Sequence, residues 1–463
     1  MASLLLWALP TAVQAQFTFQ TDLGRTMATI TAYSGPGGDV IIPSSTTKGV
    51  PVKAIANSVF FNQSTITNIT IPEGITNIGD SVFFGCSSLA SIAIPDSVIS
   101  LGSGVCFNCT SLTNATIGNH VTNCGNSMFY GCSALTTFTM GNYHFDLPGS
   151  MFSHCGNLTR VTIPDSITGI GGGAFYQCGS LTNFNLPTNI TYIGDGAFSY
   201  CSGLTNLAIP DSVTNIGNTA FYSCTNLPSV VIPNHVTSIG YDAFLYCFGM
   251  TNLTIGTNVT SIGSSAFWSC TGLTNLVIPN SVTSIGDTAF YFCSNVVSLT
   301  ISTNLGCITN WVFTYLNLTN AIIPASVTNI GDFALGGWYH SKAIYFLGNA
   351  PSQGAGVCQG DPATVYYLPG TTNNWSMFFG ECPTMLWNPQ VQSSGASFGV
   401  RTNRFGFNIT GNNNLVVKVE ACTNLANAVW SPVGTNTLTG GSAYFSDAAW
   451  ANLPRRFYRL NLP

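Results

Sequence analysis

Ile209-Pro-Asp-Ser-Val-Thr-Asn-Ile-Gly217 is repeated almost unchanged as Ile278-Pro-Asn-Ser-Val-Thr-Ser-Ile-Gly286. Both stretches belong to a block of 23 residues that returns ten times without insertion or deletion. The block starts at Ile71 and returns at Ile94, Ile117, Met140, Ile163, Leu186, Ile209, Ile232, Ile255, Ile278 and Ile301. A fixed short period predicts a solenoid, in which each unit buries its apolar face against its neighbours. Such a chain offers a long surface rather than a pocket, which favours binding over catalysis.

One unit divides into a strand, a turn and an apolar plug. Residues 204–210, Leu-Thr-Asn-Leu-Ala-Ile-Pro, end in the alternation of a short strand with one buried face. Pro210 lacks an N–H and ends the strand, Val213 and Ile216 return to the core, and Gly217 suits a tight turn. Residues 220–224 then form a short helical or irregular turn that points a phenylalanine inward. This Phe position recurs as Phe83, Phe129, Phe152, Phe175, Phe198, Phe221, Phe244, Phe267, Phe290 and Phe313.

The unit L-x-x-L-x-I-P-x-S-V-x-x-I-G-x-x-A-F-x-x-C resembles the BspA-like branch of the leucine-rich repeats over about residues 40–350. The resemblance implies a β-rich superhelix of about 12 coils with a parallel sheet. It also implies a secreted or cell-surface protein that binds proteins or other cells. The fourth unit departs, because Pro148 replaces the turn glycine, His144 replaces an apolar residue, and the Val and Ile positions are lost. The eleventh unit has 22 residues, so we expect irregularity at both.

Charged residues make up only 6% of the chain, against an ordinary value of about 25%. Residues 1–389 hold five basic and fourteen acidic residues, a net charge of −9, whereas residues 390–463 hold six basic and two acidic residues, a net charge of +4. An acidic body with few lysines excludes a nucleic-acid footprint, which needs clustered basic side chains. The charge shift predicts a domain boundary near residue 390.

The two ends predict further segments. Residues 4–9 form a short apolar core before Val13-Gln14-Ala15, which indicates a signal peptide over 1–15, or alternatively a buried N-terminal strand. No later stretch is long and apolar enough to span a membrane. We therefore expect an N-terminal β entry (16–51), the solenoid (52–350), a cap or linker (351–389) and a small all-β sandwich (390–463). The sandwich is similar to C-terminal modules of bacterial exported proteins that end in Phe-Tyr-Arg-Leu.

Ten of the sixteen cysteines occupy one position of the unit: Cys86, Cys109, Cys132, Cys155, Cys178, Cys201, Cys224, Cys247, Cys270 and Cys293. Equivalent residues of stacked coils lie about 4.8 Å apart with parallel side chains, which does not suit the geometry of a disulfide. We expect buried structural thiols that donate weakly to nearby carbonyls, and no metal site among them. Cys106 and Cys124 replace core residues. Among the remaining cysteines, Cys358 and Cys382 are the most plausible bonded pair.

Nothing in the sequence predicts a catalytic centre or a cofactor. The five histidines lie at scattered repeat positions and stand in for turn residues, apart from His120 and His235, which share one position. The acids after the turn glycine (Asp80, Asp195, Asp287, Asp332) and after the proline (Asp96, Asp165, Asp211) fit solvated turn caps better than a paired acid and base. We therefore expect that the protein is not an enzyme.

Two surfaces are candidate ligand sites. The first is the sheet face, whose outward positions include Asn114, Thr116, Arg160, Asn183, Asn185, Asn206, Asn252 and Asn275. It suits an extended chain or glycan, unless these side chains only form solubilising ladders. The second is the aromatic row after the buried Phe, with Phe84, Phe107, Tyr130, Tyr176, Tyr222, Trp268 and Tyr291. If this row is exposed it is an interaction surface, and if it covers the Phe positions it is core.

The sequence therefore predicts a secreted or surface-held binding or adhesion protein. Its ligand is a protein or a glycan, recognised through the extended solenoid surface. The alternatives are a passive component of a cell envelope or matrix and, more remotely, a carbohydrate-active enzyme.

Overall fold

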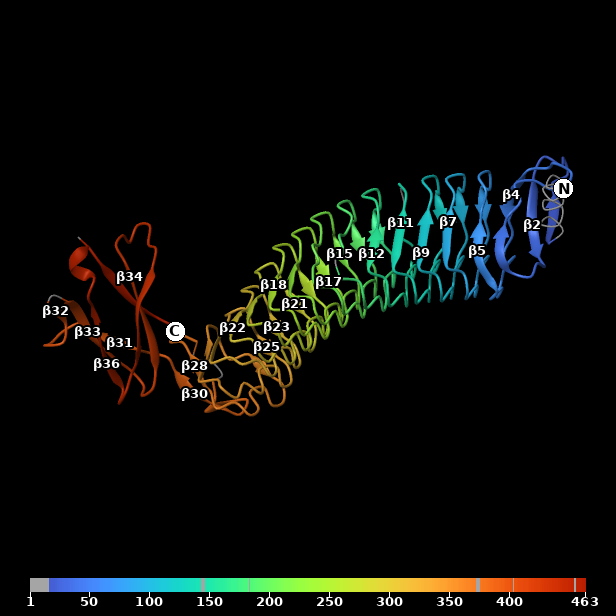
Figure 1. Ribbon diagram of the computed structural model, residues 1–463. Coiled ribbons are helices and arrows are strands. Elements are labelled where there is room, and N and C mark those ends of the chain that lie inside the picture. Colours follow the sequence, from blue (N-terminus) through green and yellow to red (C-terminus); the bar gives the residue numbers. More distant parts are fainter. Residues whose placement is uncertain (1–15, 143–145, 183, 372–374, 403, 454) are drawn as a thin grey trace.

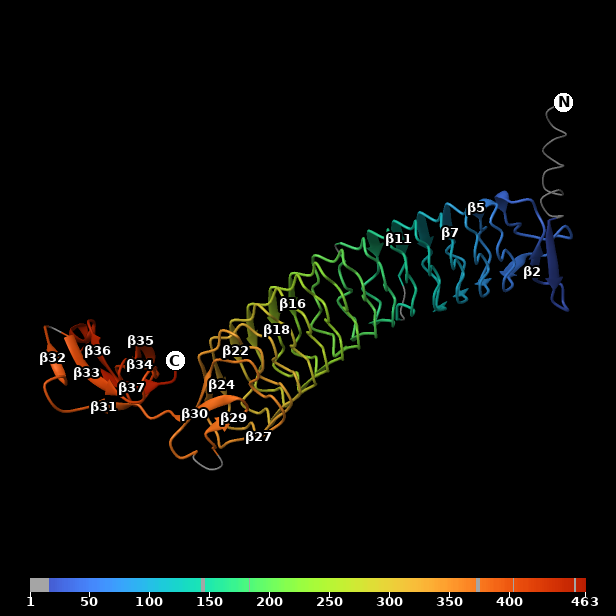
Figure 2. The same ribbon diagram turned by 90° about the horizontal axis from the view of Figure 1, so that it is seen from below.

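The chain forms a long curved solenoid that ends in a small β module (Figure 1). The computed structural model describes residues 16–142, 146–182, 184–371, 375–402, 404–453 and 455–463. The signal-peptide prediction and residues Asn183 and His144 lie outside these ranges. Figure 2 shows the coils stacked side by side along the whole length. No helix among the described residues is long and apolar enough to cross a bilayer.

The first row of strands, which carries the sheet face, is parallel but not continuous. It comprises β3 (Gly38–Ile41), β5 (Ile66–Thr70), β7 (Ser91–Ile94), β9 (Asn114–Ile117), β11 (Thr137–Met140), β12 (Arg160–Thr162), β16 (Ser229–Val231), β18 (Asn252–Thr254), β20 (Asn275–Val277), β22 (Ser298–Thr300), β24 (Asn320–Ile323), β26 (Ala343–Phe346), β28 (Thr364–Tyr367) and β30 (Cys382–Leu386). These strands form separate sheets, and β29 (Phe378–Phe379) adds an antiparallel edge at the C-terminal end. The predicted single sheet is therefore divided into segments.

A second row of strands was not predicted. It runs through β1 (Phe17–Thr21), β2 (Ala28–Tyr33), β4 (Val52–Ile55), β6 (Asn77–Ile78), β8 (Ser100–Leu101), β10 (Asn123–Cys124), β13 (Gly169–Ile170), β14 (Tyr192–Ile193), β15 (Asn215–Ile216), β17 (Ser238–Ile239), β19 (Ser261–Ile262), β21 (Ser284–Ile285), β23 (Cys307–Ile308), β25 (Asn329–Ile330) and β27 (Ser352–Gln353). Most of these strands have only two residues, too short for an alternation to show in the sequence. Except for β1, which joins antiparallel, the row is parallel.

The glycine of the repeat serves close packing between coils. A Cβ on Gly217 would lie 2.7 Å from the backbone nitrogen of Asp195, and one on Gly240 would lie 2.6 Å from that of Asn218. Neither glycine has a positive φ, so the predicted turn requirement is wrong for this position. The absent side chain lets each coil approach the one before it.

The two irregular units interrupt the second row. Gly125 and Gly171 donate their N–H to the carbonyls of Leu101 and Leu147 one coil earlier, a bond that Pro148 cannot make. The sheet accordingly ends at β10 and a new one begins at β13; at the eleventh unit it breaks again between β21 and β23. The predicted loss of the Ile position in the fourth unit is wrong, because Leu147 fills it, fully buried and bridged to Ile170.

The third side of each coil is a turn whose backbone also bonds to the next coil. The N–H groups of Thr219, Phe221 and Ser223 donate to carbonyls of residues 241, 243 and 245 at 2.7–2.8 Å. Two residues of this turn, four positions apart, have positive φ, 51° at Thr219 and 59° at Ser223. The Phe position is fully buried, and its rings form one stacked column from Phe129 to Phe313, beyond the interruption at Cys106. The ring centroids of Phe198, Phe221 and Phe244 lie 5.1–5.3 Å apart.

The C-terminal module is the predicted antiparallel sandwich. One sheet joins β31 (Gln390–Gln392), β33 (Arg404–Thr410), β32 (Gly399–Arg401) and β36 (Ser442–Asp447), and the other joins β35 (Ser431–Thr437), β34 (Val416–Cys422) and β37 (Phe457–Asn461). A single 3-10 turn, η1, spans Trp450–Asn452. Its core includes the outward Tyr345 and Tyr366 of β26 and β28, so the module packs on the sheet face of the last coils.

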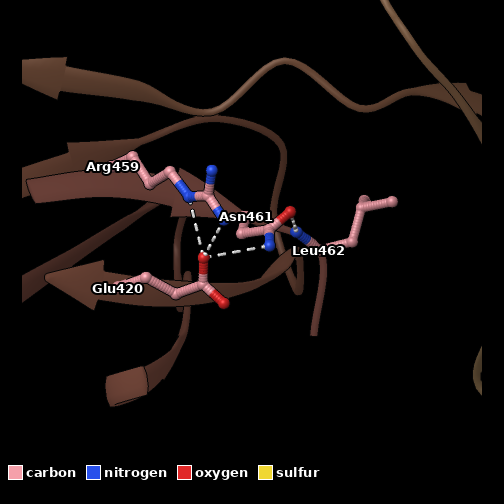
Figure 3. Close-up of polar contacts among 4 residues, drawn as sticks. All are labelled: Glu420, Arg459, Asn461 and Leu462. Atoms are coloured by element: carbon pink, nitrogen blue, oxygen red, sulfur yellow. Dashed lines mark hydrogen bonds and ion pairs between the residues drawn. The ribbon is translucent and has the colours of Figure 1, made fainter. Parts of the chain in front are cut away.

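Two acids of the module are each fixed by an arginine. Arg459 donates from Nε to Glu420 at 2.8 Å, and Asn461 donates to the same oxygen at 3.2 Å (Figure 3). The guanidinium also lies 4.6 Å from the ring centroid of Trp430. Arg456 pairs with Asp447 at 3.0 Å. Because Glu420 and Asp447 each pair with an arginine, the net positive charge of the C-terminal module comes from its remaining basic residues.

Candidate functional site

The aromatic row is an outer ladder that is separate from the buried Phe column. We define the outer aromatic ladder as Phe61, Phe84, Phe107, Tyr130, His154, Tyr176, Tyr200, Tyr222 and Tyr246, continued by Trp268, Tyr291 and Tyr315. Rings of successive members from Phe61 to Tyr246 lie 4.5–5.7 Å apart. Trp268, Tyr291 and Tyr315 continue the contacts at 5.0 and 5.4 Å. Phe61 and Tyr200 are exposed and the other members are half-buried, so the ladder lies at the surface.

The ladder alternates between two positions of the repeat. Tyr130, Tyr176 and Tyr222 directly follow the buried Phe position, as predicted. On the intervening coils that position holds Ser153, Ser199 or Leu245, and the ring comes from the next residue instead. His154, Tyr200, Tyr246 and Tyr315 are these missed members. A comparison of alternate units, rather than of one position in all units, would have found them.

The missed members have a costly backbone conformation. His154, Tyr200, Tyr246 and Tyr315 have φ of 61–63°, the left-handed region that suits glycine and asparagine. In the first coils the same position holds those residues, as Asn62, Gly85, Asn108 and Gly131. For another L-residue this region costs about 1–2 kcal/mol. Gln177, Ser223 and Ser269 share the conformation at φ of 58–59°, so the turn imposes it on every coil, with or without a ring.

Two phenols of the ladder, those of Tyr222 and Tyr291, have a raised pKa. Desolvation among its neighbours, and then the hydrogen bond with Tyr200, raises the pKa of Tyr222 to about 12. Desolvation also raises the pKa of Tyr291. These phenols therefore remain protonated, and the surface combines apolar ring edges with neutral hydroxyls.

The predicted sheet-face residues lie where the repeat places them. Asn114, Arg160, Asn185, Asn206, Asn252 and Asn275 are exposed and Thr116 is half-buried. Asn114 and Arg160 flank Thr137 in one sheet, and the Thr137 hydroxyl donates to Asn114 at 2.8 Å. Asn185 and Asn206 lie between β12 and β16, where Asn206 makes only an isolated bridge. The sheet face is therefore not formed by one continuous sheet.

The sheet face meets the C-terminal module at a hollow. A space of about 400 Å³ is lined by β22 and β24 and by Leu347 and Pro463. Ile322 points outward there, 38% exposed. Farther along the same face Val231 and Val277 are also exposed. The sequence did not predict this hollow, because it depends on how the module docks.

The carboxylates of the turns bond to neighbouring coils. Asp80 accepts from the N–H of Ser103 at 2.7 Å and Asp195 from that of Asn218 at 2.7 Å. Asp96 likewise accepts from Asn119 at 2.7 Å. Each caps the backbone of the next coil, which confirms the interpretation as turn caps.

The ten repeated cysteines are free, buried thiols. Each Sγ donates to the carbonyl of the Phe-position residue one coil earlier at 3.0–3.3 Å, as Cys224 does to Phe198 and Cys132 does to Cys106. Burial raises the pKa of Cys155, Cys201 and Cys247 to about 12. Cys358 and Cys382 are also free, so the predicted disulfide between them is wrong. Their Sγ atoms do lie close together, with a carboxylate oxygen of Asp361.

The BspA type leucine rich repeat region matches this chain in overlapping segments at residues 53–178, 145–274 and 260–374. The chain belongs to this family. No curated protein matches it. A leucine-rich repeat protein from Bacteroides ovatus ATCC 8483 has a similar structure, with 24% identity, 81% of this chain and 98% of that chain covered, and a TM-score of 0.60.

A leucine rich cell surface protein from Faecalibacterium prausnitzii A2-165 shares 26% identity, with 79% of this chain and 97% of that chain covered and a TM-score of 0.43. The BspA type family and its solenoid fold form repeat-based scaffolds for protein interaction and are in general not enzymes.

Proposed function

We propose that this protein is a secreted or cell-surface binding protein that recognises a protein partner through the outer aromatic ladder. The observation that carries the proposal is the unbroken run of rings at the surface, whose centroids lie 4.5–5.7 Å apart from Phe61 to Tyr246. On the intervening coils the rings of His154 and Tyr200 come from the neighbouring position of the repeat and fill the gaps between Tyr130, Tyr176 and Tyr222.

The ring packing favours a protein over a glycan. From Phe61 to Tyr130 the rings are nearly parallel, at 8–11°, so their faces are covered by one another and their edges face solvent. A sugar that stacks on an aromatic ring needs an open face. Apolar side chains of a protein pack equally well on ring edges. A long contiguous apolar stripe of this kind marks an interaction surface.

Export and surface retention complete the proposal. The apolar segment at residues 4–9 and the small residues before position 16 support a signal peptide. The F. prausnitzii protein that is similar to this chain is described as a cell surface protein. A passive envelope component is the alternative, and it predicts no specific partner.

The test compares two triple variants of the full mature chain. The first changes Tyr176→Ser, Tyr200→Asn and Tyr222→Ser, with Asn chosen because it tolerates the left-handed backbone. The matched control changes Asn185→Ser, Asn206→Ser and Asn252→Ser on the sheet face. Both are applied to immobilised surface proteins and to a glycan array, with thermal melting measured in parallel.

We expect the parent to bind a protein, the ladder variant to lose at least about tenfold in affinity, or about 1.4 kcal/mol, and the control to bind as the parent does. Loss of binding in the control alone would move the site to the sheet face. Binding to glycans alone would overturn the choice of partner. The absence of specific binding would favour a passive role.

The sheet face is a second candidate, because its hollow beside Leu347 and Pro463 is the place where the two parts of the chain meet. Domain junctions are common ligand sites. Exposed Ile322 and the amides of Asn252 and Asn275 would offer an extended segment both apolar and hydrogen-bonding contacts. Of the residues changed in the control variant, Asn252 tests the amide contribution to this candidate.

A further inference from the structure

In the last coil of the solenoid, the Phe position and the position of the repeated cysteine are both occupied by other residues. The N–H of Leu335 donates to the carbonyl of Val357 as that of Phe221 does to Ala243, so Cys358 occupies the Phe position. Asp361, three residues later, occupies the position of the repeated cysteine. A carboxylate thus stands where ten coils have a thiol.

A third group reaches the same place from the following strand. Cys382 begins β30 and is buried. The Sγ atoms of Cys358 and Cys382 and a carboxylate oxygen of Asp361 all lie within 4.8 Å of one another. The three residues come from two successive coils at the end of the apolar core.

These groups lack the hydrogen bonds found elsewhere in the solenoid. The repeated thiols donate at 3.0–3.3 Å, but Cys382 Sγ is 3.8 Å from the carbonyl of Asp361 and 4.0 Å from that of Cys358. Asp361 Oδ1 accepts from the N–H of Trp338 at 2.5 Å, whereas its Oδ2 is buried without a hydrogen-bond partner. A buried unpaired carboxylate oxygen is costly. A bound cation would remove that cost.

Trp338 shows that a residue other than cysteine can make the hydrogen bond of the repeated thiols. It takes the cysteine position one coil before Asp361, and its indole N–H donates to the carbonyl of Phe313 at 2.7 Å, as the thiols do. Asp361 as a carboxylate has no donor for the equivalent bond. Its presence at the last coil therefore needs a different explanation.

We propose that Cys358, Asp361 and Cys382 bind one zinc ion that fastens β30 to the last coil. Thiolate and carboxylate ligands suit Zn²⁺, whose bonds are about 2.3 Å to sulfur and about 2.0–2.2 Å to oxygen. Tetrahedral coordination at those lengths places the ligand atoms roughly 3.5–3.8 Å apart, inside the observed limit. Magnesium and calcium take oxygen ligands and are not suited to two sulfurs. Both thiols give up a proton on binding.

Both thiols are free in this structure, but a disulfide between Cys358 and Cys382 is the rival once the chain meets an oxidising compartment, because the protein is proposed to be exported. It would use both sulfurs but leave Oδ2 of Asp361 unpaired. Zinc satisfies all three groups. It would also close the open end of the apolar column, where repeat proteins need a cap.

The experiment uses the full chain, purified with reductant and freed of metal by a chelator. Zinc content is measured by native mass spectrometry after addition of Zn²⁺, and Co²⁺ is added separately to detect thiolate-to-metal absorption. The variants are Asp361→Asn, Cys358→Ser and Cys382→Ser, and the matched control is Cys224→Ser in the middle of the solenoid.

We expect one zinc per chain, a thiolate–cobalt spectrum and a higher Tm with zinc. Asp361→Asn should weaken zinc binding by at least about tenfold, and the two serine variants should lose the cobalt spectrum, whereas the control should keep both. The proposal is overturned if the chain purified without reductant is lighter by two hydrogens at Cys358 and Cys382 and binds no zinc. It is equally overturned if zinc binds but Asp361→Asn binds it unchanged. If a serine variant does not fold, the Asp361→Asn comparison and the parent's cobalt spectrum still decide.

Discussion

Phe221→Ala tests whether the buried column carries the stability of the solenoid. Phe221 is fully buried, and its ring is stacked on Phe198 at 5.3 Å and on Phe244 at 5.1 Å. Truncation of a buried Phe to Ala costs about 3–5 kcal/mol. Aromatic pairs add about 0.5–1.5 kcal/mol each beyond burial, and two are lost here, which places the effect near the upper end. We expect the free energy of unfolding to fall by about 5 kcal/mol.

The assay is urea unfolding followed by far-UV circular dichroism, together with hydrogen exchange across residues 186–254. Because each coil contacts only its neighbours, the loss should appear as faster exchange in the mutated coil and the two beside it. Tyr222→Ala is the matched control, since Tyr222 is the next residue but belongs to the half-buried outer ladder. If Phe221→Ala is no more destabilising than Tyr222→Ala, the stacked column does not hold the coils together.

Two further predictions concern the thiols and the fourth unit. Burial raises the pKa of Cys155, Cys201 and Cys247 to about 12 from an ordinary 9.0, so the folded state keeps protons that the unfolded state loses. The resulting stability is complete below pH 9 and is lost as pH rises toward 12, by about 1.4 kcal/mol per thiol at pH 10; equal unfolding free energies at pH 7.5 and 10 would contradict this. Residues 140–150 should exchange amide hydrogens faster than residues 209–220, because Pro148 cannot make the bond between coils, and equal protection in both segments would refute this.

Periodicity made much of the fold predictable. Each position of the repeat has the same surroundings in every coil. A large apolar residue such as Phe that recurs at one position therefore indicates that this position is buried in every coil. This reasoning placed Phe221 in the core and identified the thiols as donors to carbonyls. It also predicted irregularity at Pro148, although Leu147 shows that a substitute in the next position can restore a core residue.

The remaining features could not be predicted, because they depend on contacts between coils that no single unit of the sequence encodes. Gly217 looks like a turn residue in one unit, and only the 2.7 Å approach to the preceding coil shows why a side chain cannot fit. The docking of the C-terminal module on Tyr345 and Tyr366 likewise joins segments far apart in the sequence. The sequence paired Cys358 with Cys382 but missed Asp361, because only the stacking of the coils shows that Asp361 takes the position of the repeated cysteine.

The outer ladder shows how the coil spacing shapes the surface. Neighbouring coils are too close for large rings to lie at the same position without touching, so rings must either stack or alternate. The first coils stack them, and the angle between Phe107 and Tyr130 is 8°. The later coils alternate them, and the angle between Tyr176 and Tyr200 is 79°. An edge-to-face arrangement leaves part of a ring face open to solvent, which a parallel stack does not. The segment from His154 to Tyr246 therefore presents both edges and faces, so the variant at Tyr176, Tyr200 and Tyr222 probes the part of the ladder where a glycan, as well as a protein, has a ring face to contact.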